Sequence, residues 1–284
     1  QGKGRNVWFC MGFALATREA EAIAMHDCDI LTYERGLLAW LIYPVANPNF
    51  NYQFCKGYYA RVANGKINGR VSRLLVTPLL RSLKKVCGPL DFIEYLDSYR
   101  YPLAGEFSFR NDVMNDIRIP SDWGLEIGVL SEMTRNYSTK RLCQVDIADL
   151  YDHKHQELSA DDSAGLSKMS IDITKAIFRK LATNGVIFNK ESFRTVKATY
   201  FRIALDFVET YRHDAEINGL TFDIDNEERA VELFAKNIMK AGESFLDNPM
   251  ETPFIPSWNR VNSAIPELQY QLKQAVQEDM EEFS

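Results

Sequence analysis

The sequence has few cysteines and no long apolar run, and each shortage excludes a class of protein. Its 284 residues contain five cysteines, an odd number without a CxxC pair, which argues against a disulfide framework or a structural zinc site. The longest apolar stretch, residues 7–16, is broken by Gly12 and is shorter than the roughly 20 residues that span a bilayer. We therefore expect no membrane-spanning segment and a reducing, cytoplasmic location.

An excess of basic charge is also missing. The 33 lysines and arginines are outnumbered by 39 acidic residues, which leaves a formal net charge of -6. Such a chain lacks the broad cationic field with which proteins attract nucleic acids, so we expect no nucleic-acid partner. The Walker spacing and a GxGxxG after a strand are absent as well, which leaves no sign of a P-loop or a dinucleotide site.

The apolar pattern divides the chain near residue 157. Residues 1–157 alternate helical and strand-like stretches, which indicates an α/β core, whereas residues 158–284 have the spacing of helices. In the first part we expect strands at 22–25, 52–61, 103–109 and 142–147, and helices at 5–18, 36–45, 71–86 and 124–135. Pro78 should kink or restart the third of these helices. We interpret the apolar stripes of the second part as core.

Asp27 and Asp29 stand at the carboxyl end of the short apolar strand 22–25. Residues two apart on a strand point the same way, and open α/β sheets bind ligands at this end of their strands. Two carboxylates suit Mg²⁺ or Mn²⁺ when a diphosphate completes the coordination shell. For an isolated Asp-x-Asp, a strand-end turn capped by aspartate is the simpler interpretation, so other motifs have to support the metal site.

Two further segments could bind anions. Gly2-Lys3-Gly4 combines a lysine with backbone that a phosphate can approach closely, just before a helix. Gly69-Arg70-Val71-Ser72 opens another predicted helix, where a guanidinium, a hydroxyl and free N–H groups could hold an oxyanion. A solvated lysine and a solvent-exposed arginine are the alternatives.

Three other side chains are candidates for chemistry. His153 and His155 follow a strand-like stretch, and a neutral imidazole there could add a nitrogen ligand to a metal, although a loop histidine is also ordinary polar surface. Glu126 lies in an apolar segment, where an unpaired charge is unfavourable. It is either functional or paired at the edge of the core.

Taken in order, these motifs resemble one enzyme family. The segments are Gly2-Lys3-Gly4, Asp27-Cys28-Asp29, Gly69-Arg70-Val71-Ser72, Pro102-Leu103-Ala104-Gly105-Glu106, Gly124-Leu125-Glu126-Ile127-Gly128 and His153. The order and spacing are similar to those of glucosyl-3-phosphoglycerate synthases, and the match covers about residues 1–157. The resemblance implies an α/β fold, a GT-A-type (Rossmann-like) glycosyltransferase core followed by a helical C-terminal region.

The resemblance also implies a reaction and its site. These enzymes transfer glucose, with retention of configuration, from a nucleotide diphosphate sugar to the 2-hydroxyl of 3-phosphoglycerate, using Mg²⁺ or Mn²⁺. By analogy the metal ligands are Asp29 and His153, and Glu126 is the catalytic or sugar-positioning carboxylate. The implied donor-binding residues are Gly2, Lys3, Gly4, Asp27, Leu103 and Gly105. The implied acceptor-binding residues are Gly69, Arg70, Val71, Ser72 and His155.

Some features depart from the family pattern. Ser72 replaces a threonine and keeps its hydroxyl, whereas His155 replaces an acceptor-contacting asparagine, so the departures fall on the acceptor side. The resemblance further implies a homodimer, UDP- or GDP-glucose as donor, and a preceding nucleotide-binding unit of roughly a hundred residues that this chain does not contain. The alternatives are mannosyl transfer to phosphoglycerate, glucosyl transfer to another phosphorylated acceptor, and a catalytically silent scaffold of the same fold.

Overall fold

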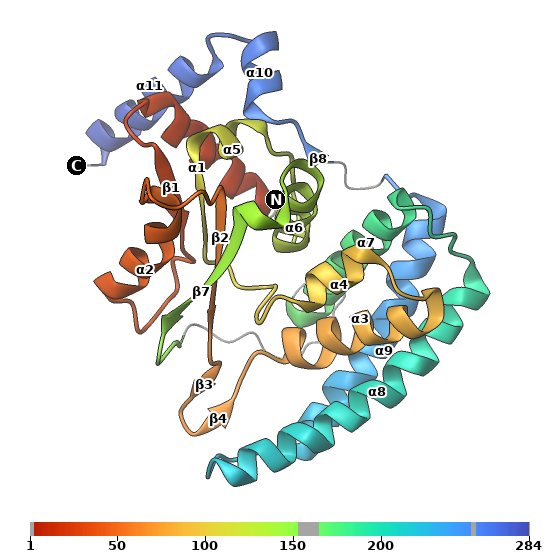
Figure 1. Ribbon diagram of the computed structural model, residues 1–284. Helices are drawn as coiled ribbons and strands as arrows, with labels where there is room; N and C mark the ends of the chain where they lie inside the picture. The colour runs from red at the N-terminus through yellow and green to blue at the C-terminus, as the bar shows by residue number, and fades with distance from the viewer. Residues whose placement is uncertain (1–2, 153–164, 251–253, 284) are drawn as a thin grey trace.

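A mixed four-stranded sheet forms the centre of the first half of the chain. The computed structural model describes residues 3–152, 165–250 and 254–283. The strands lie in the order β1 (Ala22–Met25), β5 (Phe107–Arg110), β2 (Phe54–Tyr59) and β7 (Leu142–Ala148). Strand β5 is antiparallel to both β1 and β2, whereas β2 and β7 are parallel. Strands β1, β2 and β7 therefore run in one direction and β5 in the other (Figure 1).

Helices cover both faces of this sheet. Helix α2 (Arg35–Ala46) packs on one face, where Leu37 and Leu41 form a small core with Tyr59, Ile147 and Tyr151. The opposite face belongs to the main hydrophobic core, which includes residues of α1 (Lys3–Thr17), α5 (Asn111–Asp116) and α6 (Leu125–Asn136). Alternation along β2 explains the two cores, because Phe54 belongs to the main core and Tyr59 to the small one.

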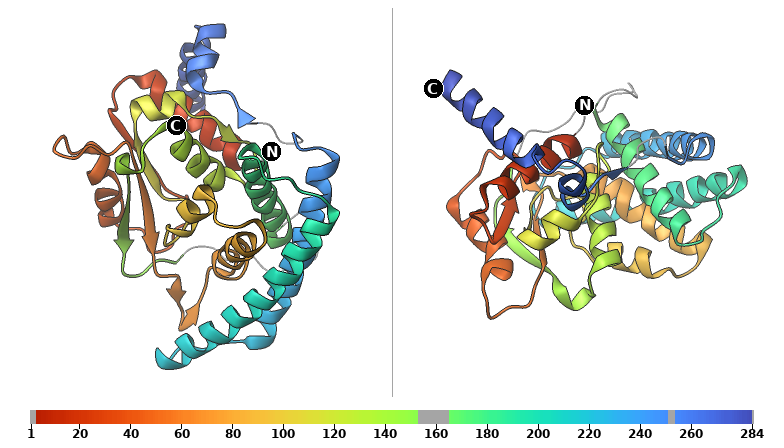
Figure 2. Two further views of the ribbon diagram at one scale, coloured as in Figure 1. Left: turned by 45° about the vertical axis from the view of Figure 1, so that its right-hand side comes forward. Right: turned by 90° about the horizontal axis from the view of Figure 1, so that it is seen from above.

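A group of helices forms the other half of the molecule. Helices α3 (Thr77–Cys87) and α7 (Gly165–Thr183) lie beside the long helices α8 (Lys190–Ile217) and α9 (Ile224–Asp247), and α4 (Asp91–Asp97) packs on α3 and α6 (Figures 1 and 2). Apolar residues from these helices join the core on the α1 and α6 side of the sheet in one hydrophobic cluster. The predicted domain boundary at residue 157 lies outside the described residues, so it stays a prediction.

The helix changes type just before Pro78, where the sequence predicts a kink or a restart. Residues Val71–Val76 form a π-helical segment, η1, and α3 starts at Thr77 with the proline in its first turn. Because Pro78 has no N–H, it cannot bond to the carbonyl four residues earlier, that of Leu74. The hydroxyl of Tyr200 from α8 donates to that carbonyl instead, at 2.5 Å. The junction between the two helix types is thus an attachment point for α8.

The last part of the described chain returns to α1. Helix α10 (Trp258–Ala264) places the buried Trp258 ring against Trp8, with stacked centroids 4.0 Å apart. Trp258 Nε1 donates to the Trp8 carbonyl and Trp8 Nε1 donates to the Pro256 carbonyl, each at 2.9 Å. Helix α11 (Leu268–Glu282) also packs on α1.

The short elements are the hairpin β3 (Val62–Ala63) and β4 (Lys66–Ile67), the pair β6 (Ile119–Pro120) and β8 (Phe254–Ile255), and the 3₁₀ turn η2 (Thr139–Arg141).

One expected strand is wrong in extent. The sequence pattern predicts an extended chain over residues 103–109, but β5 begins only at Phe107. The chain before it turns, with the Ala104 N–H bonded to the Tyr101 carbonyl at 3.2 Å, and the Asp27 carboxylate occupies the space beside Gly105. The sequence pattern also did not predict α4, α5 or α10. Within the described ranges, no helix is both long and apolar enough to cross a membrane.

Candidate active site

The strand directions bring four loops to one edge of the sheet. The carboxyl ends of β1, β2 and β7 lie beside the amino end of β5, because β5 alone runs the opposite way. Asp27 and Asp29 therefore follow β1 at the same edge where Arg61 follows β2 and Glu106 precedes β5. A single edge collects residues that are up to about 80 positions apart in sequence.

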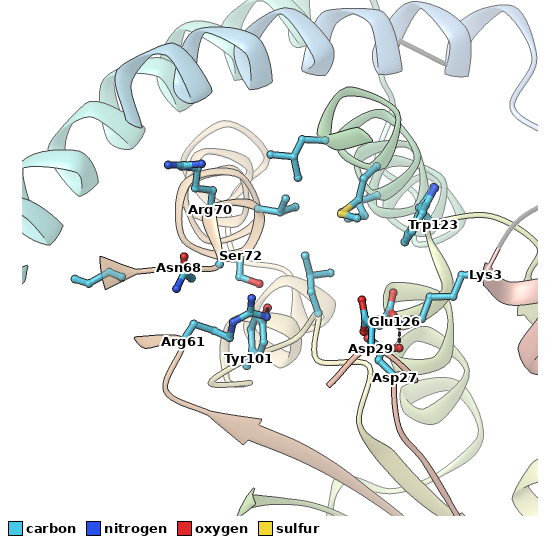
Figure 3. Close-up of a pocket in the computed structure, with 17 residues that line it drawn as sticks. Lys3, Asp27, Asp29, Arg61, Asn68, Arg70, Ser72, Tyr101, Trp123 and Glu126 are labelled. Atoms are coloured by element: carbon cyan, nitrogen blue, oxygen red, sulfur yellow. Dashed lines mark hydrogen bonds and ion pairs between the residues drawn. The ribbon is translucent and has the colours of Figure 1, made fainter. Parts of the chain in front are cut away.

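A cavity of about 210 Å³ opens at this edge (Figure 3). Nine of the predicted site residues line it, namely Lys3, Asp27, Asp29, Gly69, Arg70, Val71, Ser72, Leu103 and Glu126. Arg61, Tyr101 and Trp123 line it as well, and α7 closes it with Leu166, Met169 and Ile173. The apolar pattern of α7 predicts only that the helix is buried, and its part in the cavity wall is not visible in that pattern.

Carboxylates gather at one end of the cavity. Lys3 in the first turn of α1 bridges two of them, with Nζ 2.8 Å from Asp27 Oδ1 and 2.7 Å from Glu126 Oε1. Burial by itself lowers the pKa of Lys3, but the charges of Glu126 and Asp27 outweigh it and raise the pKa above its usual value. Together with Asp29, this end carries three carboxylates and one ammonium group (Figure 3). The remaining negative charge favours a cation.

A buried layer supports the segment that carries Asp27. The Glu106 carboxylate is fully buried and accepts hydrogen bonds from the hydroxyls of Tyr59 and Tyr151, each at 2.7 Å, and from the Asp27 N–H at 3.4 Å. Lys56 of β2 is buried nearby and donates to the Ala104 carbonyl. Burial lowers its pKa to about 8, against the opposing charges of Glu126 and Glu106.

Cationic side chains gather at the other end of the cavity. Arg61 Nη1 donates to the Tyr101 hydroxyl at 3.2 Å, and Arg70 and the buried Ser72 lie beside them (Figure 3). Gly69 has a φ of +76°, a conformation that glycine adopts without strain, and it lets the chain turn from β4 into the segment bearing Arg70. This end is suited to an anion, because a guanidinium and a hydroxyl both donate to oxyanions.

Not every predicted site residue lines the cavity. Gly4 packs against the backbone of β6, where an added Cβ would lie 1.8 Å from the Pro120 carbonyl oxygen, and Gly105 packs against the Asp27 carboxylate. Gly2, His153 and His155 lie outside the described residues, so their predicted roles stay predictions. In the part of the chain that is described, no group of three histidine, cysteine or acidic side chains is arranged as a metal site.

Two curated relatives align with almost the whole chain. A glucosyl-3-phosphoglycerate synthase from Persephonella marina is 46% identical over 278 residues, which cover 98% of this chain and 69% of the relative. One from Methanococcoides burtonii is 41% identical over 286 residues, with coverages of 100% and 70%. The chain belongs to the glucosyl-3-phosphoglycerate synthase family. It is therefore a nucleotide-sugar-dependent glycosyltransferase, as the resemblance implied. No family model matches it.

Solved structures support the fold. The crystal structure of mannosyl-3-phosphoglycerate synthase from Rubrobacter xylanophilus superposes with a TM-score of 0.51 at 25% identity, covering 66% of this chain and 53% of that one. The GT-A-type α/β fold is thereby confirmed. The Mycobacterium tuberculosis glucosyl-3-phosphoglycerate synthase, solved with Mn²⁺, UDP-glucose and phosphoglyceric acid, gives a TM-score of 0.49 at 20% identity, covering 67% and 57%.

Proposed function

We propose that this protein transfers glucose from a nucleoside diphosphate glucose to 3-phosphoglycerate, with a divalent cation and with retention of configuration. The observation that carries the proposal is a single cavity with carboxylates at one end and arginines at the other. A sugar donor and an acidic acceptor bound in one cavity could meet in an aligned geometry, which can supply a large part of a rate enhancement. Family membership supports the same pair of substrates.

The carboxylate end is the proposed donor site. Carboxylate oxygens are the ligands that Mg²⁺ and Mn²⁺ prefer, so the residues fit such an ion, and Asp29 with His153 would hold it. When bound, the ion supplies positive charge to the diphosphate oxygens as they leave the sugar. Lys3 adds a second positive charge at this end, and it fixes the positions of Asp27 and Glu126 through its two ion pairs.

Glu126 is proposed to orient the transferred sugar. Its carboxylate lies in the first turn of α6, where the helix dipole stabilises a negative charge, and it is 5% exposed. The resemblance to retaining enzymes without a carboxylate nucleophile favours front-face attack, in which the leaving phosphate accepts the proton of the acceptor hydroxyl. Glu126 then holds sugar hydroxyls and forms no covalent bond with the sugar.

The cationic end is the proposed acceptor site. The acceptor carries a carboxylate and a phosphate, which need several donors and a positive field. Arg70 and Ser72 supply side-chain donors, and the backbone around Gly69 and Val71 lies at the start of a helical segment, where N–H groups are free to bind anions. The additional contact of His155, the homodimer, the cytoplasmic location and the division at residue 157 remain predictions from the sequence.

A substrate panel tests the reaction. The purified full-length protein is incubated with 3-phosphoglycerate, Mn²⁺ or Mg²⁺, and in turn UDP-glucose, GDP-glucose, UDP-mannose or GDP-mannose, and the products are identified by mass spectrometry. The expected product is glucosyl-3-phosphoglycerate. A mannosylated product alone would support the second candidate, mannosyl transfer, which the structural likeness to a mannosyl-3-phosphoglycerate synthase favours. Neither turnover nor binding of any nucleotide sugar or Mn²⁺ would indicate a silent scaffold.

Calorimetry tests the proposed metal ligand separately. Titration of Mn²⁺ in the presence of UDP should give much weaker binding for Asp29→Ala than for the wild type, because the variant loses a carboxylate of the proposed shell. Asp225→Ala is the matched control, since Asp225 is exposed on α9. Equal binding by Asp29→Ala and the control removes Asp29 from the metal site.

A further inference from the structure

A buried carboxylate from the C-terminal helices reaches the cationic end of the cavity. Glu227, in the first turns of α9, is 3% exposed, and each of its oxygens pairs with a different arginine. Oε1 lies 2.6 Å from Arg70 Nε, and Oε2 lies 2.8 Å from Arg73 Nη2. Glu227 therefore contacts the guanidinium group that is proposed to bind the acceptor.

The second arginine anchors this carboxylate. Arg73 is buried, and its Nε donates to the Asn68 carbonyl at 2.8 Å while its Nη2 also approaches the Ile67 carbonyl at 3.3 Å. Its guanidinium lies 4.6 Å above the ring centroid of Tyr211 from α8. Glu227 therefore bonds to a side chain that is held from three directions, and its own position is fixed accordingly.

The bond to Glu227 uses only one edge of Arg70. Nε is occupied, whereas neither Nη atom makes a hydrogen bond within residues 3–152, 165–250 and 254–283. The side chain is 29% exposed and lines the cavity. A guanidinium held through Nε presents its two Nη groups as a planar fork, the geometry that binds a carboxylate or phosphate through two parallel hydrogen bonds.

Glu227 and the two arginines that it binds also carry a net positive charge, which favours binding of an anion. One carboxylate compensates one of the two guanidinium groups, so Glu227, Arg70 and Arg73 together keep one positive charge. Arg61 adds another on the same cavity wall. Glu227 can therefore hold Arg70 in place without cancelling the attraction for an acidic acceptor.

We infer that Glu227 is a positioning residue for the acceptor, one that acts by fixing Arg70 through its Nε so that the Nη edge faces the acceptor oxyanion. The inference rests on the proposed function for the identity of that acceptor. It assigns to a helix of residues 158–284, which the motif resemblance does not cover, a direct influence on the acceptor site. Among the described residues, the hydrogen bonds of the Glu227 carboxylate go to Arg70 and Arg73 at the cationic end.

The test measures acceptor and donor binding separately. Glu227→Gln keeps the side-chain size but cannot accept from both arginines with equal strength. We expect the Kd and KM for 3-phosphoglycerate to rise about 10- to 100-fold, the effect of losing a hydrogen bond to a charged group, while the KM for the nucleotide sugar changes less than about twofold. Glu228→Gln is the matched control, because it removes the same charge from an exposed neighbour on α9.

A double-mutant cycle separates positioning from a general structural effect. In an Arg70→Ala background, Glu227→Gln should weaken acceptor binding by less than about twofold, because the residue through which it acts is gone. If Glu227→Gln unfolds the protein, Glu227→Asp provides the same comparison, since it keeps the charge and shortens the reach by one methylene group.

The possible outcomes distinguish this inference from the proposed function. If the wild type glucosylates 3-phosphoglycerate and a folded Glu227 variant binds it equally or more tightly, the inference alone is overturned. A full effect of Glu227→Gln in the Arg70→Ala background overturns it as well. If the wild type neither binds nor glucosylates 3-phosphoglycerate, the proposed function fails and this inference fails with it.

Discussion

The substitution Gly105→Ala provides a sharp test of the donor end, because the added methyl group would meet the Asp27 carboxylate. An ideal Cβ at Gly105 lies 2.4 Å from Asp27 Oδ2 and 2.6 Å from its Cγ. Non-bonded heavy atoms are comfortable only from about 3.5 Å. The carboxylate therefore has to move by about 1 Å, and its ion pair with Lys3, now 2.8 Å, is lengthened or broken.

The expected effect on stability is small and the effect on activity is large. The Asp27 side chain is 31% exposed, so it can turn toward solvent, and we expect a loss of about 1 kcal/mol in the free energy of unfolding, the low end for an added methyl group. A 1 Å displacement of a binding group can reduce a rate about 100-fold. This corresponds to about 2.7 kcal/mol of transition-state stabilisation. Urea denaturation measures the first quantity, and kcat/KM for the nucleotide sugar measures the second.

The control is Gly36→Ala. Gly36 lies in α2, where an added Cβ meets only the side chain of Glu34, at 3.2 Å, so this variant should keep the wild-type kcat/KM. The reasoning fails if Gly105→Ala is folded and its kcat/KM stays within about twofold of the control. It also fails if the variant unfolds. In that case the added methyl group would have disrupted the surrounding packing, whereas we expect it to displace only the Asp27 carboxylate.

Other parts of the structure allow equally direct tests. Trp258→Ala should lower the free energy of unfolding in urea by about 3–5 kcal/mol, since the ring is buried against Trp8, whereas the exposed Trp40→Ala should change it by less than about 0.5 kcal/mol. Because burial lowers the pKa of Lys56 from 10.5 to about 8, the unfolded chain binds more protons between these values. Wild-type stability relative to Lys56→Met should therefore rise by about 2 kcal/mol from about pH 7.5 to about pH 9.5, and an unchanged difference contradicts the shift. Glu126→Gln should lower kcat about 10- to 100-fold in a protein that stays folded, and a kcat near wild type removes Glu126 from the sugar site.

Local patterns in the sequence predict only part of the donor end. An apolar strand followed by Asp-x-Asp predicts that both carboxylates lie at the carboxyl end of the strand and point to the same side. Side chains alternate along a strand, and open α/β sheets bind ligands at that end. The change of helix type next to Pro78 is predictable for the same reason, since it depends on one missing N–H. The pairing of Lys3 with Glu126 was not predictable from spacing, because the two residues are 123 positions apart and meet only after α1 and α6 pack together.

Long-range packing also explains what the sequence pattern did not predict. Residues 103–106 precede an apolar strand and were grouped with it, but the chain turns there, with the Ala104 N–H bonded to the Tyr101 carbonyl, and β5 begins only at Phe107. The apolar stripe of α7 predicts burial and does not reveal that Leu166 and Ile173 border a cavity. The bond between Arg70 and Glu227 spans 157 positions, and an exposed arginine was an equally good interpretation of the sequence.

The two ends of the cavity depend on different parts of the chain. The donor end is built on the sheet edge, where hydrogen bonds of β1, β2 and β5 and the Glu106 carboxylate fix the backbone of Asp27. The acceptor end is built on η1, whose position depends on α8 through the Tyr200 bond and on α9 through Glu227. A change in how α8 and α9 pack would therefore move Arg70 and leave Asp27 in place. Differences in acceptor preference among proteins of this fold should accordingly be traceable to residues of the C-terminal helices, even where the donor motifs are identical.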